Sequence, residues 1–503
     1  MLDTIWKVSY FMSDRNSRRK DAPMKQDDVR ILAVELPEDV LKAKWCGDFA
    51  RAFRLIRQYQ QCDRTPEMLK QRLEVEKEIL ERLPLDYEPT MEEAVALVQK
   101  DIPDFTMEEL EALIDQGKVD WIYIDGKTHP ATRFYETLLD VQPDIARRAG
   151  KIQENFEETD DTRIRNEAIA RIKETKIQGS HIRIKASLQV KPESFKQEEI
   201  LVHLPIPKPQ KNMRNIRVIS TYPAADTEGV TVQIGDEDQP QRTVAFKEVM
   251  TENHPFSVEY EYDSVVEYND LTVPADKDQP KTAETFTQDD LKEIPPHIRF
   301  TDTIKALCTE LSKDETDPLK LARKFYDYVT TKVVYSYMRT YFTLEEIPEY
   351  AALGLKGDCG VQALLFITLC RCAGIPARWQ SGLYVTPAFG SMEAEAGMHD
   401  WAMFFVEPYG WLFADCSFGG SAFRCGNMER WNYYFGNLDV NRMAANDGYQ
   451  AGFTPAKSFT RQDPYDSQVG EAEYKSGGLI WKDTIREKEV LEHRPLEDPA
   501  NDH

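Results

Sequence analysis

The chain has 503 residues, of which 41% are hydrophobic and 11% aromatic, and its formal net charge is −24 at pH 7. A chain of this length exceeds the size at which a single core stops growing, so we expect several packed domains. The strong negative charge repels phosphate backbones and anionic membrane surfaces, which argues against nucleic acid or a membrane as the main partner.

Cysteine content and the N-terminal residues bear on the compartment. Eight cysteines are few for this length and show no repeated spacing, which favours a reducing compartment over a disulfide framework. The first residues, MLDTIWKVSYFMSDRNSRRK, lack the pattern of a signal peptide. No stretch approaches the roughly 18 apolar residues of a membrane span. We therefore expect a cytoplasmic protein.

The N-terminal third is predicted to be helical. Residues 1–30 are expected to form a terminal segment and linker, because the stretch 13–28 is polar and charged. Residues 31–178 are expected to form a helical domain, which is either an accessory domain or one that binds a protein partner. Its helices are predicted from apolar periodicity over 38–61, 66–83 and 133–145, from capping boxes at Thr90–Glu93 and Thr106–Glu109, and from a charged stretch, taken as a solvated helix, over 155–176.

A short hairpin and then a β domain interrupt the helical pattern. WIYIDG at 121–126 predicts a strand followed by an Asp-Gly turn. From His181 the apolar residues alternate, which indicates strands with one buried face. Residues 179–290 are predicted to form an antiparallel β-sandwich and linker, with strands near 182–190, 200–204, 230–234, 244–249 and 256–268.

The remaining chain is predicted to hold an α+β core over 291–445 and a C-terminal extension over 446–503. Apolar helices are expected over 300–311 and 317–335, the second ending in the short strand VVY. A further helix is predicted from Val361 to Cys372, where Gly374 and Pro376 stop it. The architecture expected from the whole sequence is a multidomain α+β protein.

Cys359 comes at the first turn of that last helix, directly after Gly357 and Asp358. Unpaired N–H groups and the positive end of the helix dipole favour a thiolate at such a position. The same N–H groups are suited to hold an oxyanion. Cys359 is therefore a candidate nucleophile.

A thiol at a helix start still needs a proton carrier. His399 is the only histidine between Ile298 and Leu491, so it is the candidate base, and a His-rich metal site is excluded there. His399 opens the predicted strand HDWAMFFV, and WLFADC at 411–416 is the next. A five-residue loop over Val406–Gly410 puts Asp415 opposite Trp401 and on the face of His399, whereas a four-residue loop puts them on opposite faces.

These blocks together resemble the core of the transglutaminase-like enzymes, a branch of the papain-like cysteine enzymes. The resemblance rests on GDC followed by an apolar helix and GIPAR, then HxW and GWxxxD, and it covers about 300–425. It implies Cys359 as nucleophile, His399 as general base and acid, and Asp415 as the carboxylate that orients the imidazole. It also implies a nucleophile helix packed against an antiparallel sheet.

The resemblance adds further candidates and two departures. Tyr335, Tyr337 and Trp401 are candidates for the oxyanion hole or the substrate groove. Asp400 stands where a small residue is usual, and Cys416 where proline is usual. Strand alternation is expected to turn Asp400 to the face opposite His399.

The sequence therefore predicts a cysteine enzyme that attacks an amide bond of a peptide or protein and forms a thioester. Hydrolysis, as in a peptidase or deamidase, is preferred over cross-linking to an amine. The alternative is a catalytically silent scaffold that binds a protein through a groove. No cofactor and no metal are expected, since no acidic loop has the spacing of a calcium site.

Overall fold

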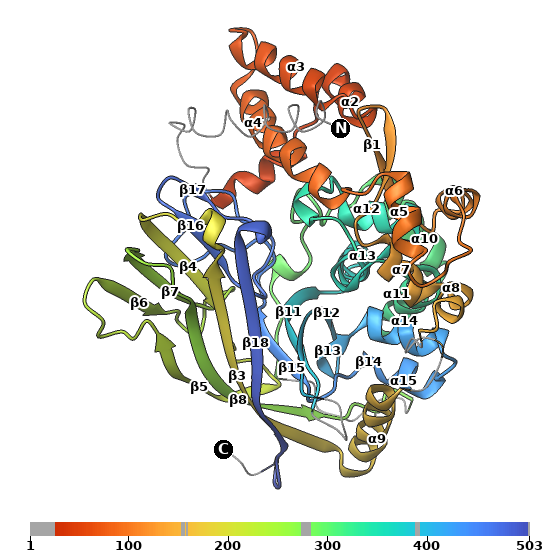
Figure 1. The fold of residues 1–503 in the computed structure, drawn as a ribbon. Coiled ribbons are helices and arrows are strands. Elements are labelled where there is room, and N and C mark those ends of the chain that lie inside the picture. Colours follow the sequence, from red (N-terminus) through yellow and green to blue (C-terminus); the bar gives the residue numbers. More distant parts are fainter. Residues whose placement is uncertain (1–25, 152–155, 157–158, 273–282, 388–392, 501–503) are drawn as a thin grey trace.

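The computed structural model describes residues 26–151, 156, 159–272, 283–387 and 393–500. Figure 1 shows a helical region, a pair of β-sheets, and a mixed core in which helices cover a third sheet. This arrangement confirms the predicted multidomain α+β architecture. The predicted N-terminal segment at 1–30 lies mostly outside the described residues, and so does the stretch 273–282 of the linker predicted near the end of 179–290.

The N-terminal region is helical as predicted. Both predicted capping boxes form, at Thr90–Glu93 and Thr106–Glu109. WIYIDG forms a hairpin whose turn residues Asp125 and Gly126 have positive φ angles. The elements are η2 (Gln26–Ala33), α2 (Glu38–Trp45), α3 (Phe49–Gln61), α4 (Glu67–Arg82), η3 (Leu83–Asp86), α5 (Met91–Val98), α6 (Met107–Asp115), β1 (Trp121–Ile124), β2 (Lys127–Pro130), α7 (Phe134–Val141), α8 (Pro143–Arg148) and α9 (Asp160–Thr175).

Three helical predictions need correction. The helix predicted over 133–145 is two helices, α7 and α8, which are separated at the extended residue Gln142. The helix predicted over 38–61 is two helices, because Gly47 adopts a φ of 76° and a Cβ there would overlap the backbone of Tyr123. The stretch predicted as a solvated helix, α9, is instead packed: Ile169 and Ile172 are buried in the same apolar cluster as the helices of the core. Helix α9 therefore joins the core rather than leading away from it.

The β region consists of two antiparallel sheets that share one apolar cluster, as predicted for a sandwich. The sheet orders are β17-β16-β4-β7-β6 and β18-β3-β8-β5. Strands β5, β16 and β17 were not predicted, and β18 lies in a stretch for which a strand or a short helix was expected. The strands are β3 (Ile177–Val190), β4 (Glu199–Pro205), β5 (Met213–Tyr222), β6 (Val230–Ile234), β7 (Thr243–Val249), β8 (Phe256–Glu267), β16 (Glu471–Tyr474), β17 (Gly477–Gly478) and β18 (Thr484–Pro495), with η4 (Pro192–Ser194) and η7 (Trp481–Asp483) in the loops.

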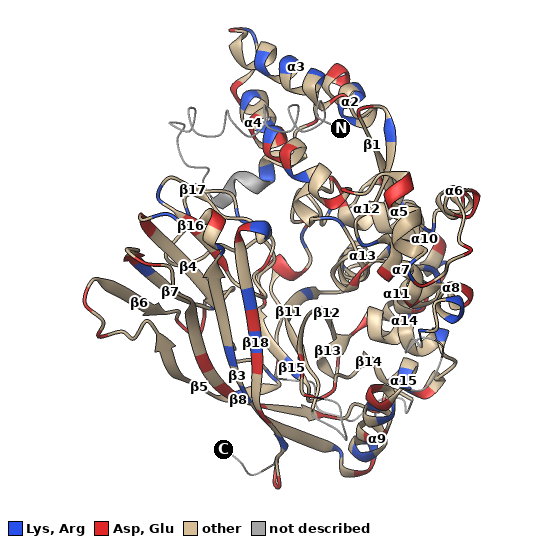
Figure 2. Ribbon diagram, viewed as in Figure 1, with Lys and Arg blue, Asp and Glu red and all other residues tan. Residues whose placement is uncertain are grey.

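The C-terminal extension therefore returns to the sandwich. Strand β18 pairs with β3 along almost its whole length, and β16 pairs with β4. Figure 2 marks basic and acidic positions along the ribbon of β18, which carries Arg, Lys and Glu and whose residues are mostly exposed or half-buried. Charges of both signs along this edge strand oppose pairing with another chain.

The core places a helical layer on one face of a five-stranded sheet of order β14-β13-β12-β11-β15. Helix α13 packs against β12 and β11. The elements are η5 (Gln288–Asp290), α10 (Asp302–Ser312), α11 (Pro318–Lys332), β9 (Val334–Tyr335), η6 (Tyr341–Thr343), α12 (Ile347–Gly354), β10 (Lys356–Gly357), α13 (Cys359–Cys372), β11 (Ala377–Val385), β12 (Ala396–Val406), β13 (Gly410–Ala414), α14 (Cys416–Arg424), α15 (Met428–Tyr433), β14 (Phe435–Gly436) and β15 (Arg442–Asn446).

Both faces of the core sheet are covered. Ala402, Phe404 and Val406 of β12 pack in the cluster that contains α13. Trp401, Met403 and Phe405 alternate with them and pack in the cluster of the sandwich. Because neither face is left to solvent, the sheet joins the core and the sandwich into one packed structure. Among the described residues, no helix is long and apolar enough to cross a membrane.

Candidate functional site

Cys359 is the first residue of α13, as the sequence predicts. The N-cap is Asp358, whose carboxylate accepts a hydrogen bond from the N–H of Val361 at 3.1 Å and from the hydroxyl of Tyr341. Gly360 follows because a Cβ there would overlap the Tyr341 hydroxyl. The segment GDCG thus caps the helix and keeps the space beside the thiol narrow.

The thiol is hydrogen-bonded to a carboxyl group rather than to an imidazole. Cys359 Sγ donates to Asp400 Oδ2 at 3.2 Å. Burial, followed by the negative charges of Asp400 and Asp358, raises the pKa of the Cys359 thiol well above its usual value. The prediction that the helix start favours a thiolate is therefore wrong for this arrangement, because burial of the thiol, followed by the two carboxyls, outweighs the helix N-terminus.

The two carboxyls beside the thiol are themselves perturbed. Burial raises the pKa of Asp358 to about 6. Burial, and then the neighbouring charges of Asp466 and Asp358, raise the pKa of Asp400 well above its ordinary value. Both carboxyls therefore hold their protons to higher pH than an ordinary aspartate does, and groups perturbed in this way are typical of sites that transfer protons.

His399 and Asp415 are brought together as predicted. Val406 pairs with Gly410, and Ala402 pairs with Ala414, so the hairpin has the register of the five-residue loop. His399 Nε2 lies 2.7 Å from Asp415 Oδ2. Burial lowers the pKa of the imidazole. Burial alone raises the pKa of Asp415, but His399 and Arg442 outweigh it and hold that pKa well below its usual range.

Cys359 and His399 are not joined by a hydrogen bond. Asp400 is two residues from Ala402 and so lies on the same face of β12, the face that packs towards α13. His399 is two residues from Trp401 and lies on the opposite face, which packs towards the sandwich. The prediction that alternation turns Asp400 away from His399 is confirmed, and the face it turns to is the one that holds the nucleophile helix. His399 instead contacts the ring of Phe418 at 4.6 Å between ring centroids.

The three oxyanion or groove candidates are separated. Tyr335 lies near the thiol, since Cys359 and Asp358 contribute to raising the pKa of its hydroxyl after burial. The ring of Tyr337 lies under the guanidinium of Arg133, at 3.5 Å from its centroid, and so faces α7. Trp401 is buried and donates its indole N–H to Gln380 at 2.7 Å, on the sandwich side.

Several residues of the site were not found from the sequence. Gln468 donates to Asp400 Oδ1 at 2.6 Å and to Asp466 Oδ2 at 2.9 Å. Arg442 donates to the same Asp415 oxygen that contacts His399, at 2.7 Å. No local pattern marks Gln468 or Arg442, since both come from segments far along the chain. Among the described residues, no group of three or more His, Cys, Asp or Glu side chains is arranged to hold a metal ion.

The comparisons with known proteins agree with the order of these motifs. Residues 305–416 match the family model of the transglutaminase-like superfamily. No curated protein matches the chain.

Two solved structures are similar in part. One is a candidate cysteine protease from Cytophaga hutchinsonii, with 14% identity and a TM-score of 0.37, covering 63% of this chain and 91% of that one. Another is the periplasmic domain of TgpA from Pseudomonas aeruginosa, with 12% identity and a TM-score of 0.29, covering 53% of this chain and 96% of that one. With Cys359, His399 and Asp415 all inside the matched residues, the chain carries, over 305–416, a domain of the transglutaminase-like superfamily.

Proposed function

We propose that this chain is a cysteine amidohydrolase that cleaves an amide bond of a peptide or protein. The observation that carries the proposal is the position of Cys359 at the first residue of α13, inside a transglutaminase-like domain. The sulfur attacks the carbonyl carbon, the amine leaves with a proton, and a thioester remains. Water then releases the acid and regenerates the thiol.

The N–H groups of the first turn are the groups we assign to the oxyanion. Asp358 already occupies the N–H of Val361. The N–H groups of Cys359 and Gly360 precede it and point from the same helix start. Such donors stabilise the negative charge of a tetrahedral intermediate without reorganising during the reaction.

The resemblance assigns the proton transfer to His399 and its orientation to Asp415. The 2.7 Å contact between these two side chains supports that assignment. The hydrogen bond of the thiol to Asp400 speaks against it in this conformation. His399 as general base stays a prediction, as do cytoplasmic residence and partner binding by the helical region.

A non-catalytic scaffold is the second candidate, and one observation favours it. The pKa of the Cys359 thiol is raised by burial and by two carboxyls, which is the opposite of what most cysteine nucleophiles show. A scaffold with an inert thiol requires no activated cysteine. The two candidates therefore differ in whether Cys359 reacts faster than the other seven cysteines.

The test uses the purified full chain and a peptide library analysed by mass spectrometry. We expect turnover that is lost in Cys359→Ala and retained in Cys372→Ala, because Cys372 is half-exposed at the far end of the same helix. Added methylamine separates the reaction types: free acid products indicate hydrolysis, and methylamide products indicate transamidation. Absence of Cys359-dependent turnover, with Cys359 alkylated no faster than the other cysteines, would favour the scaffold.

A further inference from the structure

Asp400 occupies a position from which it can exchange a proton with the nucleophile. Its Oδ2 is 3.2 Å from Cys359 Sγ, within the distance over which a general base abstracts a proton. Its backbone N–H also faces the sulfur and favours the ionised form. No other described carboxyl or imidazole is hydrogen-bonded to this thiol.

We infer that Asp400 is the catalytic base that takes the proton of Cys359 when the sulfur attacks its substrate. The inference rests on the proposed function, and it reassigns the step that the family resemblance gives to His399. It accounts for an aspartate at the position where the related enzymes usually have a small residue.

The proton balance is complete without another reactant. As the sulfur–carbon bond forms, the thiol proton moves to Asp400 Oδ2 and the carbonyl oxygen becomes an oxyanion. The carbon–nitrogen bond then breaks, and Asp400 returns the proton to the departing amine. During hydrolysis of the thioester, Asp400 takes a proton from water and the resulting hydroxide adds to the thioester carbon. The carbon–sulfur bond then breaks, and Asp400 returns that proton to the departing sulfur.

A second carboxyl keeps Asp400 suited to this role. Asp466 is hydrogen-bonded to Asp400, and the Gln468 amide donates to both of them. Two carboxyls in contact titrate in separated steps, so over the intervening pH range the pair holds one proton and one negative charge. Asp400 Oδ2 then accepts the thiol proton while the retained proton lies between Asp400 and Asp466.

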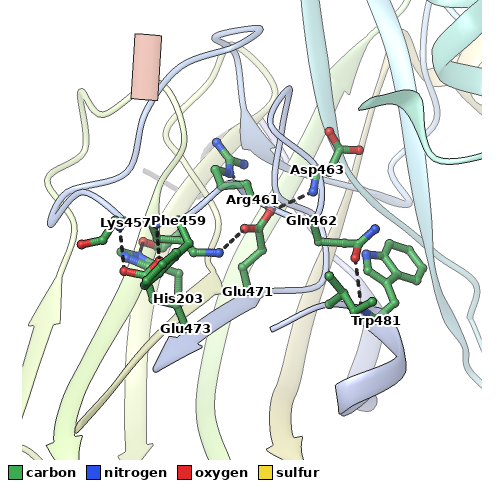
Figure 3. A network of polar contacts seen from close by, with 12 residues as sticks. His203, Lys457, Phe459, Arg461, Gln462, Asp463, Glu471, Glu473 and Trp481 are labelled. Carbon is green, nitrogen blue, oxygen red and sulfur yellow. Dashed lines mark hydrogen bonds and ion pairs between the residues drawn. The ribbon is translucent and has the colours of Figure 1, made fainter. Parts of the chain in front are cut away.

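Figure 3 shows a network of polar contacts around Glu471 and Arg461, which links the C-terminal extension to strand β16 of the sandwich. Glu471 of β16 contacts Lys457 at 2.8 Å and Arg461 at 3.3 Å. Arg461 in turn donates to the backbone carbonyl of Asp466 at 2.5 Å. The same strand fixes the start of the loop, because Glu473 accepts from the N–H groups of Ser458 and Phe459. Gln468 is therefore a positioning residue, presented by a loop that these contacts hold against the sandwich.

The charged and titratable groups around Asp400 come from three elements. Helix α13 and its cap contribute Cys359 and Asp358, η6 contributes Tyr341, and the C-terminal extension contributes Asp463, Asp466 and Tyr449. Acylation is expected to increase as the Asp400–Asp466 pair loses its first proton. In a variant without the Asp400 carboxyl, the rate of acylation should instead follow ionisation of the thiol itself, which for an ordinary cysteine occurs at about pH 8.5.

The experiment measures acetylation of Cys359 by p-nitrophenyl acetate across pH. The released p-nitrophenolate is followed by absorbance, and the acetyl group is located by peptide mapping. We expect Asp400→Asn to acetylate about 10²- to 10⁴-fold more slowly than the wild type near neutral pH. Asp400→Glu should restore part of the rate. His399→Gln tests the rival base, because the family resemblance predicts a larger loss of rate in His399→Gln than in Asp400→Asn. Gln468→Ala should shift the pH dependence of acetylation, because the Gln468 amide donates to both Asp400 and Asp466.

The direction of the Asp400→Asn effect separates this inference from a structural role. If Asp400 were only a neighbouring charge, its removal would lower the pKa of the thiol and speed both acetylation and alkylation. Faster or unchanged acetylation of Asp400→Asn overturns the inference, as does loss of acetylation in His399→Gln alone. Iodoacetamide alkylation of Cys372 and thermal unfolding show whether each variant is folded. Wild-type chain that is not acetylated at Cys359 contradicts both this inference and the proposed function.

Discussion

His399 Nε2 and Arg442 Nη1 both lie 2.7 Å from one oxygen of Asp415, at a site where all three side chains are buried. Arg442 also donates to Asp439 through Nε and Nη2. The guanidinium therefore neutralises two buried carboxylates and joins β15 to the start of α14. Removing one member of such a set leaves uncompensated charge in the interior.

We expect Arg442→Met to lower the free energy of unfolding by about 3 to 5 kcal/mol, because Asp415 and Asp439 lose their shared cation. Urea denaturation at neutral pH measures this. The matched control is Arg494→Gln, whose ion pair with Glu492 is exposed and which should change stability by at most about 0.5 kcal/mol. Equal effects of the two substitutions would contradict the role assigned to Arg442.

Two buried histidines predict loss of stability in mild acid. Burial lowers the pKa of His297 to about 3, and burial together with Lys457 and Arg461 lowers that of His203 to about 3. Below the ordinary pKa of 6.5 the unfolded chain binds protons that the folded chain does not. Stability contributed by the neutral imidazoles is therefore present above about pH 6.5 and is lost as the pH falls towards 3.

Each of these histidines should contribute a slope of about 1.4 kcal/mol per pH unit inside that window. His297→Gln keeps a polar group near Tyr465. Between pH 6 and 4.5 it should reduce the slope of unfolding free energy against pH by about 1.4 kcal/mol per pH unit, which corresponds to one proton fewer taken up on unfolding. Above pH 7 the variant and the wild type should show the same slope. An unchanged slope in the acid window would show that His297 is protonated in the folded chain.

The network of Glu471 predicts a second buried-charge effect. Burial raises the pKa of Glu471, but Lys457 and Arg461 outweigh it and lower the pKa to about 2. Its contribution is present above the ordinary carboxyl pKa of 4.5 and is lost as the pH falls towards 2. We expect Glu471→Gln to cost about 3 to 5 kcal/mol at pH 7, because both cations lose their charge partner.

Chemical denaturation of Glu471→Gln checks this expectation. The control is Glu487→Gln, an exposed residue of β18 whose replacement should have almost no effect. The difference between the two variants should shrink as the pH falls towards 2. A constant difference down to that pH would mean that the cost comes from packing and not from charge.

Gly360 is predicted to be intolerant of any side chain. A Cβ there would overlap the Tyr341 hydroxyl and approach Asp400 Oδ2 to 2.9 Å. Gly360→Ala should therefore displace groups beside the nucleophile and slow acetylation of Cys359 about a hundredfold. Gly397→Ala is the control, since a Cβ at that position of β12 meets nothing within 4 Å. Equal acetylation rates in the two variants would show that the space beside Cys359 is not restrictive.

Much of the core is determined by the sequence alone, because its signals are local. The Asp358 cap and the apolar run start the helix at Cys359, and Gly374 ends it. The loop at Val406–Gly410 sets the register of β12 and β13 and thereby the contact of His399 with Asp415. A period of two residues also determines that Asp400 and His399 point to opposite faces.

Tertiary structure alone decided which of those faces receives α13 and therefore which side chain contacts the thiol. It also decided that Gln468, 68 positions beyond Asp400 in the chain, returns to hold that carboxyl. Strand and helix patterns specify periodicity but not the partner of each face, since apolar residues occupy both faces of β12. Contacts between distant segments arise only when sheets and helices pack, and the proton partner of Cys359 is one of them.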